Sequence, residues 1–586
     1  MKNILRLFRR FDKDYKNFTL YICLMSIIMG FLPLINIYAP KLIIEELIGR
    51  ANQATIAKIL GLVLLVNIIL VLLRRVYEAY FTLVFESMTD KLLFELSEKS
   101  LTLPIEKTDS KDVQDMLEKA HVSVFNIYDL WETLNIATSS LITGVFALAI
   151  LVKLNLFLPL LGVGIIIANR IFVKLIKKNE IYYQEKSAGE NRIYRYFSEF
   201  AQDNKHAKDI KIYGGEELIL SKSEKYLNKL VNTNKQYYTK NGFYGGMMNI
   251  TSSVGIVLAL TYLTYRLTNK SVSLADFTLY FSSIIQLINT VNIVQKNYAQ
   301  VISVNENMNS YFEFMNLPER SSEEGEISTN KLDKVSIKFD KVSFKYPKSN
   351  SYILKNCSFE IKDGETVALV GKNGAGKSTI VKLLCKFYDP SEGNIYINDI
   401  NIKDISAKDY HKILSPTFQD FRLFPFKISE NIAGIKEEEI SKDNLAKIKD
   451  STKLLGIDEW IASTSKGLAT YLTLLFSKEG VEPSGGLGQK IALARSMAHG
   501  GGFFIMDEPT SALDPRSEQE IFEKMLEISK GQTSLFISHR LSSTKYADRI
   551  IVCDDGKIIE NGNHDSLIKK DGLYKKMYTS QADLYI

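Results

Sequence analysis

The stretch ETVALVGKNGAGKSTIVKLL, from Glu365 to Leu384, has residue types and spacing suited to binding phosphate. A buried-looking strand, Thr366 to Val370, leads into a loop that reads Gly371, Lys372, Asn373, Gly374, Ala375, Gly376, Lys377, Ser378 and Thr379, and a helix follows at once. Glycines let backbone N–H groups curl around phosphate oxygens, and the start of the helix adds partial positive charge. We expect Lys377 to reach the β- and γ-phosphates of a nucleotide and Ser378 to ligate Mg²⁺.

A second candidate is the pair of carboxylates in GGFFIMDEPTSALD, from Gly501 to Asp514. Asp507 ends an apolar strand, where it could hold Mg²⁺ through water, and Glu508 follows it, where it could polarise an attacking water. Taken alone, such a pair is as often a solvated strand end. Its occurrence after a phosphate-binding loop favours nucleotide hydrolysis.

A third candidate is EPSGGLGQK, from Glu482 to Lys490, in which Ser484, Gly485 and Gly486 precede an Ala-rich run. A helix that begins there would offer bare backbone N–H groups to an anion. The stretch by itself is equally consistent with a plain turn, so its meaning depends on its neighbours.

The elements that must position these residues divide the chain in two. The first half contains six apolar runs near the length that crosses a bilayer, about 17–39, 57–77, 132–152, 155–174, 243–266 and 274–296. Segments 78–131 and 175–242 between them are long, charged and helix-patterned, whereas the other connections are short. From about residue 335 the pattern changes to strand-loop-helix units of an α/β domain.

The distribution of charge predicts how the chain is oriented in the membrane and argues against a secreted or nucleic-acid-binding protein. Six basic residues against two acidic ones precede the first apolar run, which predicts a cytoplasmic N-terminus and places the long segments in the cytoplasm. That run is too long for a cleavable signal peptide. The net charge of +6 is not gathered in one block, so we expect no nucleic-acid partner. The four cysteines have no CxxC spacing, which argues against a disulfide or zinc framework.

With these motifs in this order, the chain resembles a half-transporter of the ABC exporter type, including those that export peptides and bacteriocins. The resemblance implies an all-α six-helix transmembrane domain with long cytoplasmic hairpins at 1–316, a linker at 317–334, and an α/β P-loop NTPase domain at 335–586. It implies ATP and Mg²⁺ as cofactors and a multi-pass location in the bacterial cytoplasmic membrane. It also implies that the hairpins near Thr108 to Ala120 and Gln202 to Tyr213 transmit motion.

The resemblance assigns roles residue by residue. Tyr346 in FKYP matches the aromatic that stacks on adenine, and Gln419 matches a glutamine that contacts Mg²⁺ alongside Ser378 and Asp507. His539 in FISHR matches the histidine near the γ-phosphate, which joins Glu508 as a catalytic residue. The loop Ser511 to Asp514 matches the segment that joins two such domains.

The resemblance also implies a dimer in which ATP lies between the P-loop of one subunit and the Ser-Gly-Gly of the other. Compared with the family signature LSGGQ, this chain has Pro483 first and Leu487 fifth, while Ser484, Gly485, Gly486 and Gln489 are kept. Leucine removes an amide that could bond the nucleotide, so we expect a weakened contact. An altered signature also occurs in asymmetric heterodimers; because Glu508 is kept, a homodimer is favoured over a heterodimer.

The cargo is open at this point. An exported amphipathic peptide or peptide-like product is favoured, a lipid or multidrug exporter is the first alternative, and an ATP-gated sensor that does not pump is another. The first apolar run starts so early that we expect no leader-cleaving protease domain ahead of it. Arg74, Arg75 and Arg170 near membrane depth either extend to the interface or contact an anionic group.

Overall fold

Six apolar runs fold as long helices, and each of these helices contains one of the six candidate membrane spans. The computed structural model describes residues 2–49, 53–125, 127–319, 334–508, 523–524, 531–538 and 541–582. The residues group into two compact units, one of 1–99 with 115–317 and one of 100–114 with 318–586. The six apolar helices of the predicted fold class are confirmed, and the second unit contains the alternating strands and helices expected of an α/β domain.

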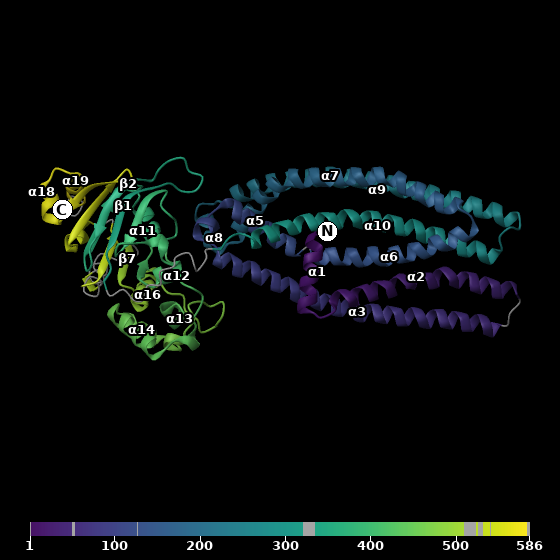
Figure 1. Ribbon diagram of the computed structural model, residues 1–586, viewed down its shortest axis with the longest axis horizontal. Helices are drawn as coiled ribbons and strands as arrows, with labels where there is room; N and C mark the ends of the chain where they lie inside the picture. The colour runs from purple at the N-terminus through teal and green to yellow at the C-terminus, as the bar shows by residue number, and fades with distance from the viewer. Residues whose placement is uncertain are drawn as a thin grey trace. The chain divides into compact units, whose positions relative to one another are not determined.

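The long helices of the helical unit run side by side, and the short α1 lies across them (Figure 1). The helices of this half of the chain are α1 (Lys2–Asp14), α2 (Phe18–Ile48), α3 (Gln53–Thr102), α5 (Lys111–Phe125), α6 (Ile127–Leu154), α7 (Phe157–Gln202), α8 (Asn204–Ile212), α9 (Glu216–Thr268) and α10 (Leu274–Met315). The short α4 (Ile105–Thr108), between α3 and α5, belongs to the second unit. At 1.5 Å per residue, the 53 residues of α9 span about 80 Å, far more than a bilayer needs.

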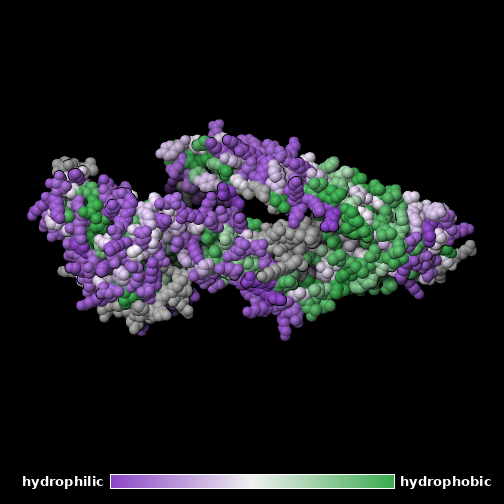
Figure 2. Space-filling view, turned by 45° about the horizontal axis from the view of Figure 1, so that its top comes forward, coloured by the Kyte–Doolittle hydropathy of each residue, from purple (hydrophilic) through white to green (hydrophobic). Residues whose placement is uncertain are grey.

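Helix α3 shows why the unit needs a membrane. None of its most apolar window is buried inside the chain, so leucines such as Leu62 and Leu64 present more than 60% of their surface outward. On the face in Figure 2, hydrophobic residues of this unit form a broad green surface with purple, hydrophilic surface beyond it. Such a continuous apolar surface fits hydrocarbon and not water.

The second unit is built on two sheets. The antiparallel sheet has the order β2-β1-β4-β5, and the larger sheet has the order β10-β9-β3-β8-β7-β6, parallel except at β10. The strands are β1 (Ile337–Phe344), β2 (Leu354–Ile361), β3 (Thr366–Gly371), β4 (Glu392–Ile397), β5 (Ile400–Asn401), β6 (Leu414–Thr417), β7 (Phe503–Asp507), β8 (Thr533–Ile537), β9 (Arg549–Asp554) and β10 (Lys557–Gly562).

Helices cover both faces of the larger sheet. They are α11 (Lys377–Leu384), α12 (Ala407–His411), α13 (Ile428–Ala433), α14 (Lys442–Leu454), α15 (Asp458–Ser463), α16 (Gly485–His499), α18 (His564–Lys569) and α19 (Leu573–Ala582). Short 3₁₀ turns lie at Ile402–Asp404, Glu437–Glu439, Gly467–Ala469 and Leu541–Tyr546. Figure 1 shows α13, α14 and α16 gathered on one side of the sheets.

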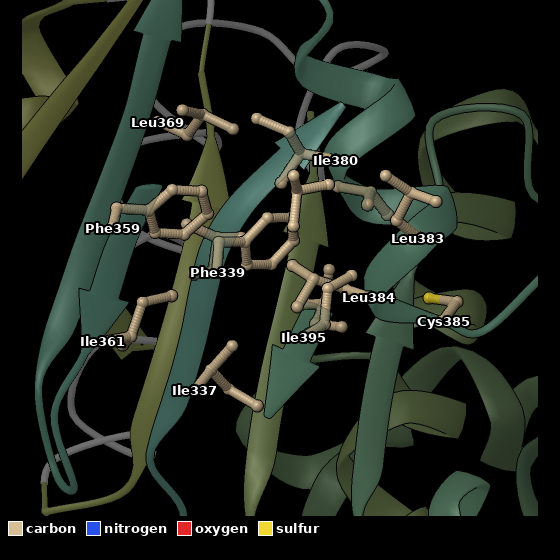
Figure 3. Packing of buried hydrophobic residues seen from close by; sticks show 14 of the residues in the cluster. Ile337, Phe339, Phe359, Ile361, Leu369, Ile380, Leu383, Leu384, Cys385 and Ile395 are labelled. Carbon is tan, nitrogen blue, oxygen red and sulfur yellow. The ribbon is translucent and has the colours of Figure 1, made fainter. Parts of the chain in front are cut away.

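The core explains why β3 is apolar from Val367 to Val370. Val367 and Leu369 point into the cluster that β1, β2, β4 and α11 complete, while Ala368 and Val370 point into the cluster formed with α13 and α16. Figure 3 shows the first cluster, in which the rings of Phe339 and Phe359 stack with centroids 4.4 Å apart and Ile380 and Leu384 pack from α11. A parallel strand covered on both faces is apolar throughout, and this packing fixes the point where β3 ends.

Candidate ATP site

The loop between β3 and α11 can be formed only with glycine at two of its positions. Gly371 has φ of +154°, and a Cβ added there would lie 2.0 Å from the carbonyl oxygen of Cys553 on β9. Gly376, with φ of +103°, is the N-cap of α11, and a Cβ there would lie 2.7 Å from the side chain of Leu354. The loop therefore presents backbone and the start of a helix, which is the arrangement that binds phosphate.

Lys377 lies folded over this loop. Its Nζ donates hydrogen bonds to the carbonyl oxygens of Gly371 at 2.8 Å and Lys372 at 3.1 Å, and the residue is 7% exposed. Burial lowers the pKa of Lys377, and the nearby carboxylate of Glu508 opposes that shift. An anion arriving at the loop would therefore meet an ammonium group already held beside the backbone N–H groups.

Asp507 is the last residue of β7, and its carboxyl group lies against the start of α11. It is 6% exposed, and its Oδ1 atom is buried with no hydrogen-bond partner among the described residues. Burial first, and then Glu508, raise the pKa of Asp507 to about 6, while a hydrogen bond with the Ser378 side chain acts against that rise. A buried carboxyl oxygen without a donor is a suitable ligand for a hard cation such as Mg²⁺.

Glu508 follows in a left-handed backbone conformation, with φ of 48°. Its backbone N–H donates to the carbonyl oxygen of Ile537 on β8 at 3.1 Å, so the strand edge holds this turn in place. The Nε2 atom of Gln419, just beyond β6, donates to Glu508 Oε2 at 2.7 Å. Non-glycine residues in this conformation are uncommon, and they occur often at functional sites.

Tyr346 follows β1 and lies next to the first turn of α11. Its hydroxyl group is 3.2 Å from Thr379 Oγ1, and the Nζ atom of Lys382 is 5.3 Å from its ring centroid. The ring of Tyr388 packs edge-on against it, with centroids 5.4 Å apart. This arrangement brings an aromatic ring beside the phosphate-binding loop from a distant part of the sequence.

The Ser-Gly-Gly turn begins α16, with Ser484 as the N-cap; its side chain accepts from the backbone N–H of Leu487 at 3.5 Å. Gly485 is exposed, with nothing within 4 Å of an added Cβ, so its backbone is accessible. Leu487 instead packs partly buried against the core cluster, and Gln489 is 1% exposed. Among the described residues, no hydrogen bond or ion pair joins this turn to the phosphate-binding loop of the same chain.

Two sequence-predicted features lie outside the described residues: His539 and the loop Ser511 to Asp514. The structure thus brings predicted site residues together from the ends of β1, β6 and β7 and from the start of α11. They are Tyr346, Lys377, Ser378, Thr379, Gln419, Asp507 and Glu508. Among the described residues, no group of three or more His, Cys, Asp or Glu side chains could hold a metal ion.

One further contact joins segment 100–114 to the ATPase core of the same compact unit. Sequence reasoning singled out the hairpin near Thr108 to Ala120 but not the residues that make this contact. The Tyr388 hydroxyl donates to Asp109 Oδ2 at 2.6 Å, and Lys348 forms an ion pair with Asp112. Burial and Asp109 raise the pKa of Tyr388, so the phenol stays protonated as the donor. The segment that connects α3 to α5 is therefore bonded to a tyrosine that packs on Tyr346.

Comparisons with known proteins agree with this arrangement. A family model described as "ABC transporter" matches residues 354–511, and one described as "ABC transporter transmembrane region" matches residues 19–291. The subtilin transport ATP-binding protein SpaT of Bacillus subtilis is 29% identical over 99% of this chain and 95% of its own length. The nisin transport ATP-binding protein NisT of Lactococcus lactis subsp. lactis is 26% identical, with coverage of 97% and 94%.

The chain is also similar to a lipid flippase and to an exporter of known structure. An ATP-dependent lipid A-core flippase of Vibrio parahaemolyticus is 31% identical over 63% of this chain and 62% of its own length. A solved bacterial Atm1-family ABC exporter has a TM-score of 0.81, covering 96% of this chain and 98% of that chain. At 23% identity, that structure shows the shared fold alone.

Proposed function

Because this chain belongs to the ABC transporter family and holds its membrane and ATP-binding parts in one polypeptide, we propose that it is half of a dimeric exporter of an amphipathic peptide. The chain is a multi-pass membrane ATPase of the exporter type, with its nucleotide-binding domain in the cytoplasm. The peptide cargo is supported by one observation: two relatives that match over nearly their whole length are named as transport proteins for subtilin and nisin, which are peptides. The lipid flippase matches over a smaller part of both chains.

The family resemblance suggests a role for each site residue, and the geometry of the described residues supports several of these roles. Tyr346 stacks on adenine, the backbone of residues 371–379 surrounds the phosphates, and Lys377 exchanges its bonds to loop carbonyls for bonds to phosphate oxygens. Glu508 orients and deprotonates the attacking water, and Gln419 holds the carboxylate of Glu508 until then. His539 is proposed to contact the γ-phosphate.

Mg²⁺ is proposed to bind with ATP, through oxygen atoms of Ser378, Gln419 and Asp507. All three offer hard oxygen ligands, and Asp507 has a buried oxygen without a donor. When bound, Mg²⁺ would neutralise the charge that develops on the phosphates. The cation would also offset the unfavourable burial of the Asp507 carboxylate.

The second half of each ATP site is proposed to come from the partner subunit, which offers Ser484, Gly485 and Gly486, with Gln489 supporting the helix behind them. A helix start with open N–H groups attracts a γ-phosphate. ATP would then hold two subunits together, and hydrolysis would release them. A homodimer is the simplest partner arrangement, since Glu508 is kept.

Transport by vesicles tests the proposed function. Inside-out vesicles with the reconstituted protein should accumulate a fluorescent amphipathic peptide against its gradient when Mg²⁺ and ATP are added, whereas vesicles with Glu508→Gln should not. A second batch of the same vesicles would contain a fluorescent phospholipid in place of the peptide. Movement of the lipid and not of the peptide would contradict the peptide assignment, and ATP hydrolysis with neither movement would indicate a sensor.

The altered signature makes Leu487→Gln informative. An amide at this position can bond the partner's nucleotide, and one such bond contributes about 1 kcal/mol, so basal ATPase should rise about threefold to sixfold. Because Leu487 packs against the core cluster, the same change should also lower Tm, by about 2 °C to 4 °C. Leu487→Met keeps the apolar contact without an amide and should leave the rate near the parent value. An unchanged or lower rate in Leu487→Gln would contradict the weakened-contact interpretation.

Tyr388→Phe tests how ATP hydrolysis is coupled to movement of the membrane helices. The change removes the hydroxyl bonded to Asp109 and keeps the ring that packs on Phe344 and Tyr346. We expect peptide-stimulated ATPase and transport to fall about tenfold, since a hydrogen bond to a charged group contributes about 1.5 kcal/mol or more. ATP affinity, measured by nucleotide titration, should change by less than about twofold. A parallel loss of ATP affinity would assign Tyr388 to the nucleotide pocket instead.

A further inference from the structure

The helical unit contains a cavity of about 1340 Å³ between α2, α3 and α6. Pockets for drug-sized ligands span about 300 to 1,000 Å³. This cavity is larger, so it has room for a segment of several amino-acid side chains. Its walls belong to one compact unit, and none of its lining residues comes from the ATPase domain.

Many of the residues that line the cavity follow the spacing of a helix. On α3 the lining includes Arg75, Ala79, Thr82, Glu86 and Asp90, at intervals of three or four residues. On α6 it includes Glu132, Asn135, Ile136 and Ser139, and on α2 it includes Met29 and Pro33, at the same helical spacing. Residues three or four apart lie on one side of a helix. Each of the three helices thus presents a row of evenly spaced residues to the same space.

The two arginines of this cavity are already paired. Arg74 Nε lies 2.7 Å from Glu78 Oε1, and Arg75 NH1 lies 3.1 Å from Glu78 Oε2. Both guanidinium groups therefore share one carboxylate on the next turn of α3. This pairing weakens the hypothesis, raised by the sequence, that these arginines contact an anionic group of the cargo.

The remaining charges of the cavity are negative. Glu86, Asp90 and Glu132 form no ion pair within the described part of the chain, and all three are exposed to the cavity side of their helices. The adjacent Lys91 is engaged elsewhere, with its Nζ 2.8 Å from Asp14 Oδ1. In total, four carboxylates against two guanidinium groups line the cavity, which leaves it formally anionic.

Apolar surface lies beside these carboxylates. Phe81, Leu83 and Ile136 line the same cavity, together with Met29. Glu132 begins the membrane-spanning part of α6, and α3 continues from the cavity toward segment 100–114, which joins the ATPase unit. The cavity is consequently at the cytoplasmic end of the membrane helices, with an apolar and an anionic portion.

We propose that this cavity is the cytoplasmic entry site for the cargo and that it binds a lysine- or arginine-bearing amphipathic segment through Glu86, Asp90 and Glu132. The inference rests on the proposed export of a peptide and adds the sign of its charge. Cationic side chains pair with the three carboxylates, and apolar side chains of the segment contact Phe81, Leu83 and Ile136. Electrostatic complementarity of this kind selects among peptides of similar hydrophobicity.

The test is direct binding, without nucleotide, of labelled peptides to the full-length protein in lipid nanodiscs. The probe is an amphipathic peptide with four lysines, compared with the same peptide in which glutamine or glutamate replaces each lysine. The variant is Glu86→Gln/Asp90→Asn/Glu132→Gln. The matched control, Glu98→Gln/Glu217→Gln/Glu224→Gln, removes the same charge at exposed positions that do not line the cavity.

The lysine peptide should bind the parent and the control protein at least tenfold more tightly than it binds the cavity variant, and the glutamate peptide should bind all three weakly. Equal affinity of the lysine peptide for parent and variant would overturn the proposal. A variant that loses dimer mass on light scattering would overturn it too, since the carboxylates would then hold a second copy of the chain. Retained thermal stabilisation by ATP shows that the variant is folded. If vesicles accumulate a neutral peptide while the cavity variant binds the lysine peptide as tightly as the parent does, the proposed peptide export is supported. Only the assignment of a cationic cargo is then contradicted.

Discussion

Replacing Glu508 by glutamine is expected to lower ATP turnover by about 10²-fold to 10⁴-fold while leaving ATP binding intact. The side chain is nearly isosteric, and its amide oxygen can still accept the 2.7 Å hydrogen bond from Gln419 Nε2. The backbone turn at φ of 48° is unaffected, because the bond from the Glu508 N–H to Ile537 is made by the main chain. What is lost is the carboxylate that takes a proton from the attacking water.

The variant should therefore retain ATP. We expect the nucleotide to remain bound through desalting, in a closed dimer, whereas the parent protein releases ADP. Phosphate release measures turnover, and retained radiolabelled ATP measures occlusion. Glu438→Gln removes the same charge from an exposed 3₁₀ turn outside the site and should behave as the parent. Normal phosphate release by Glu508→Gln would remove this glutamate from the catalytic role.

The phosphate-binding loop could be predicted from sequence because its causes are local. The apolar strand, the glycines and the helix start follow one another within 20 residues, and the backbone conformation at Gly371 and Gly376 requires glycine. The same holds for the start of α16 at Ser484, where a side chain caps its own helix. Short-range patterns of this kind need no knowledge of the tertiary fold.

The contact between Tyr388 and Asp109 could not be predicted in this way. The two residues are 279 positions apart, and each is an ordinary polar residue in its own segment. The bond depends on where segment 100–114 lies relative to β1 and α11, which is set by packing. The position of Tyr346 beside Thr379 was expected only through a family resemblance, for the same reason.

The lengths of the helices could not be predicted from the apolar runs alone. The apolar part of α3 ends near Arg74 and Arg75, yet the helix continues to Thr102. Buried side chains such as Val84, Met88, Leu92 and Leu96 continue the helical spacing of three to four residues into the charged region. Hydropathy marks where a helix leaves hydrocarbon, whereas helical periodicity marks where it ends. The paired charges at Arg74, Arg75 and Glu78 lie at this transition, next to the cavity.

A dimer made from two differently inactivated chains is expected to retain one intact ATP site, and this outcome decides whether the partner is a second copy. Lys377→Ala removes the ammonium held over the phosphate-binding loop. Gly485→Asp places a carboxylate at the start of α16, where nothing lies within 4 Å of an added Cβ, so the chain's own fold is kept. An acidic residue even stabilises a helix N-terminus, yet it repels a γ-phosphate approaching from another subunit.

Both changes are made in Glu508→Gln chains carrying different affinity tags, so that retained ATP can be counted. The parent Glu508→Gln dimer should retain about two ATP, each dimer with one kind of second change should retain none, and the doubly tagged mixed dimer should retain about one. The reason is that one of its two sites combines Lys377 of one chain with Gly485 of the other, while the second site combines both defects. No recovery of a doubly tagged dimer would indicate an unlike partner chain. A mixed dimer that retains no ATP would mean that each chain builds its site from its own P-loop and its own Ser-Gly-Gly turn, contrary to the proposed shared site.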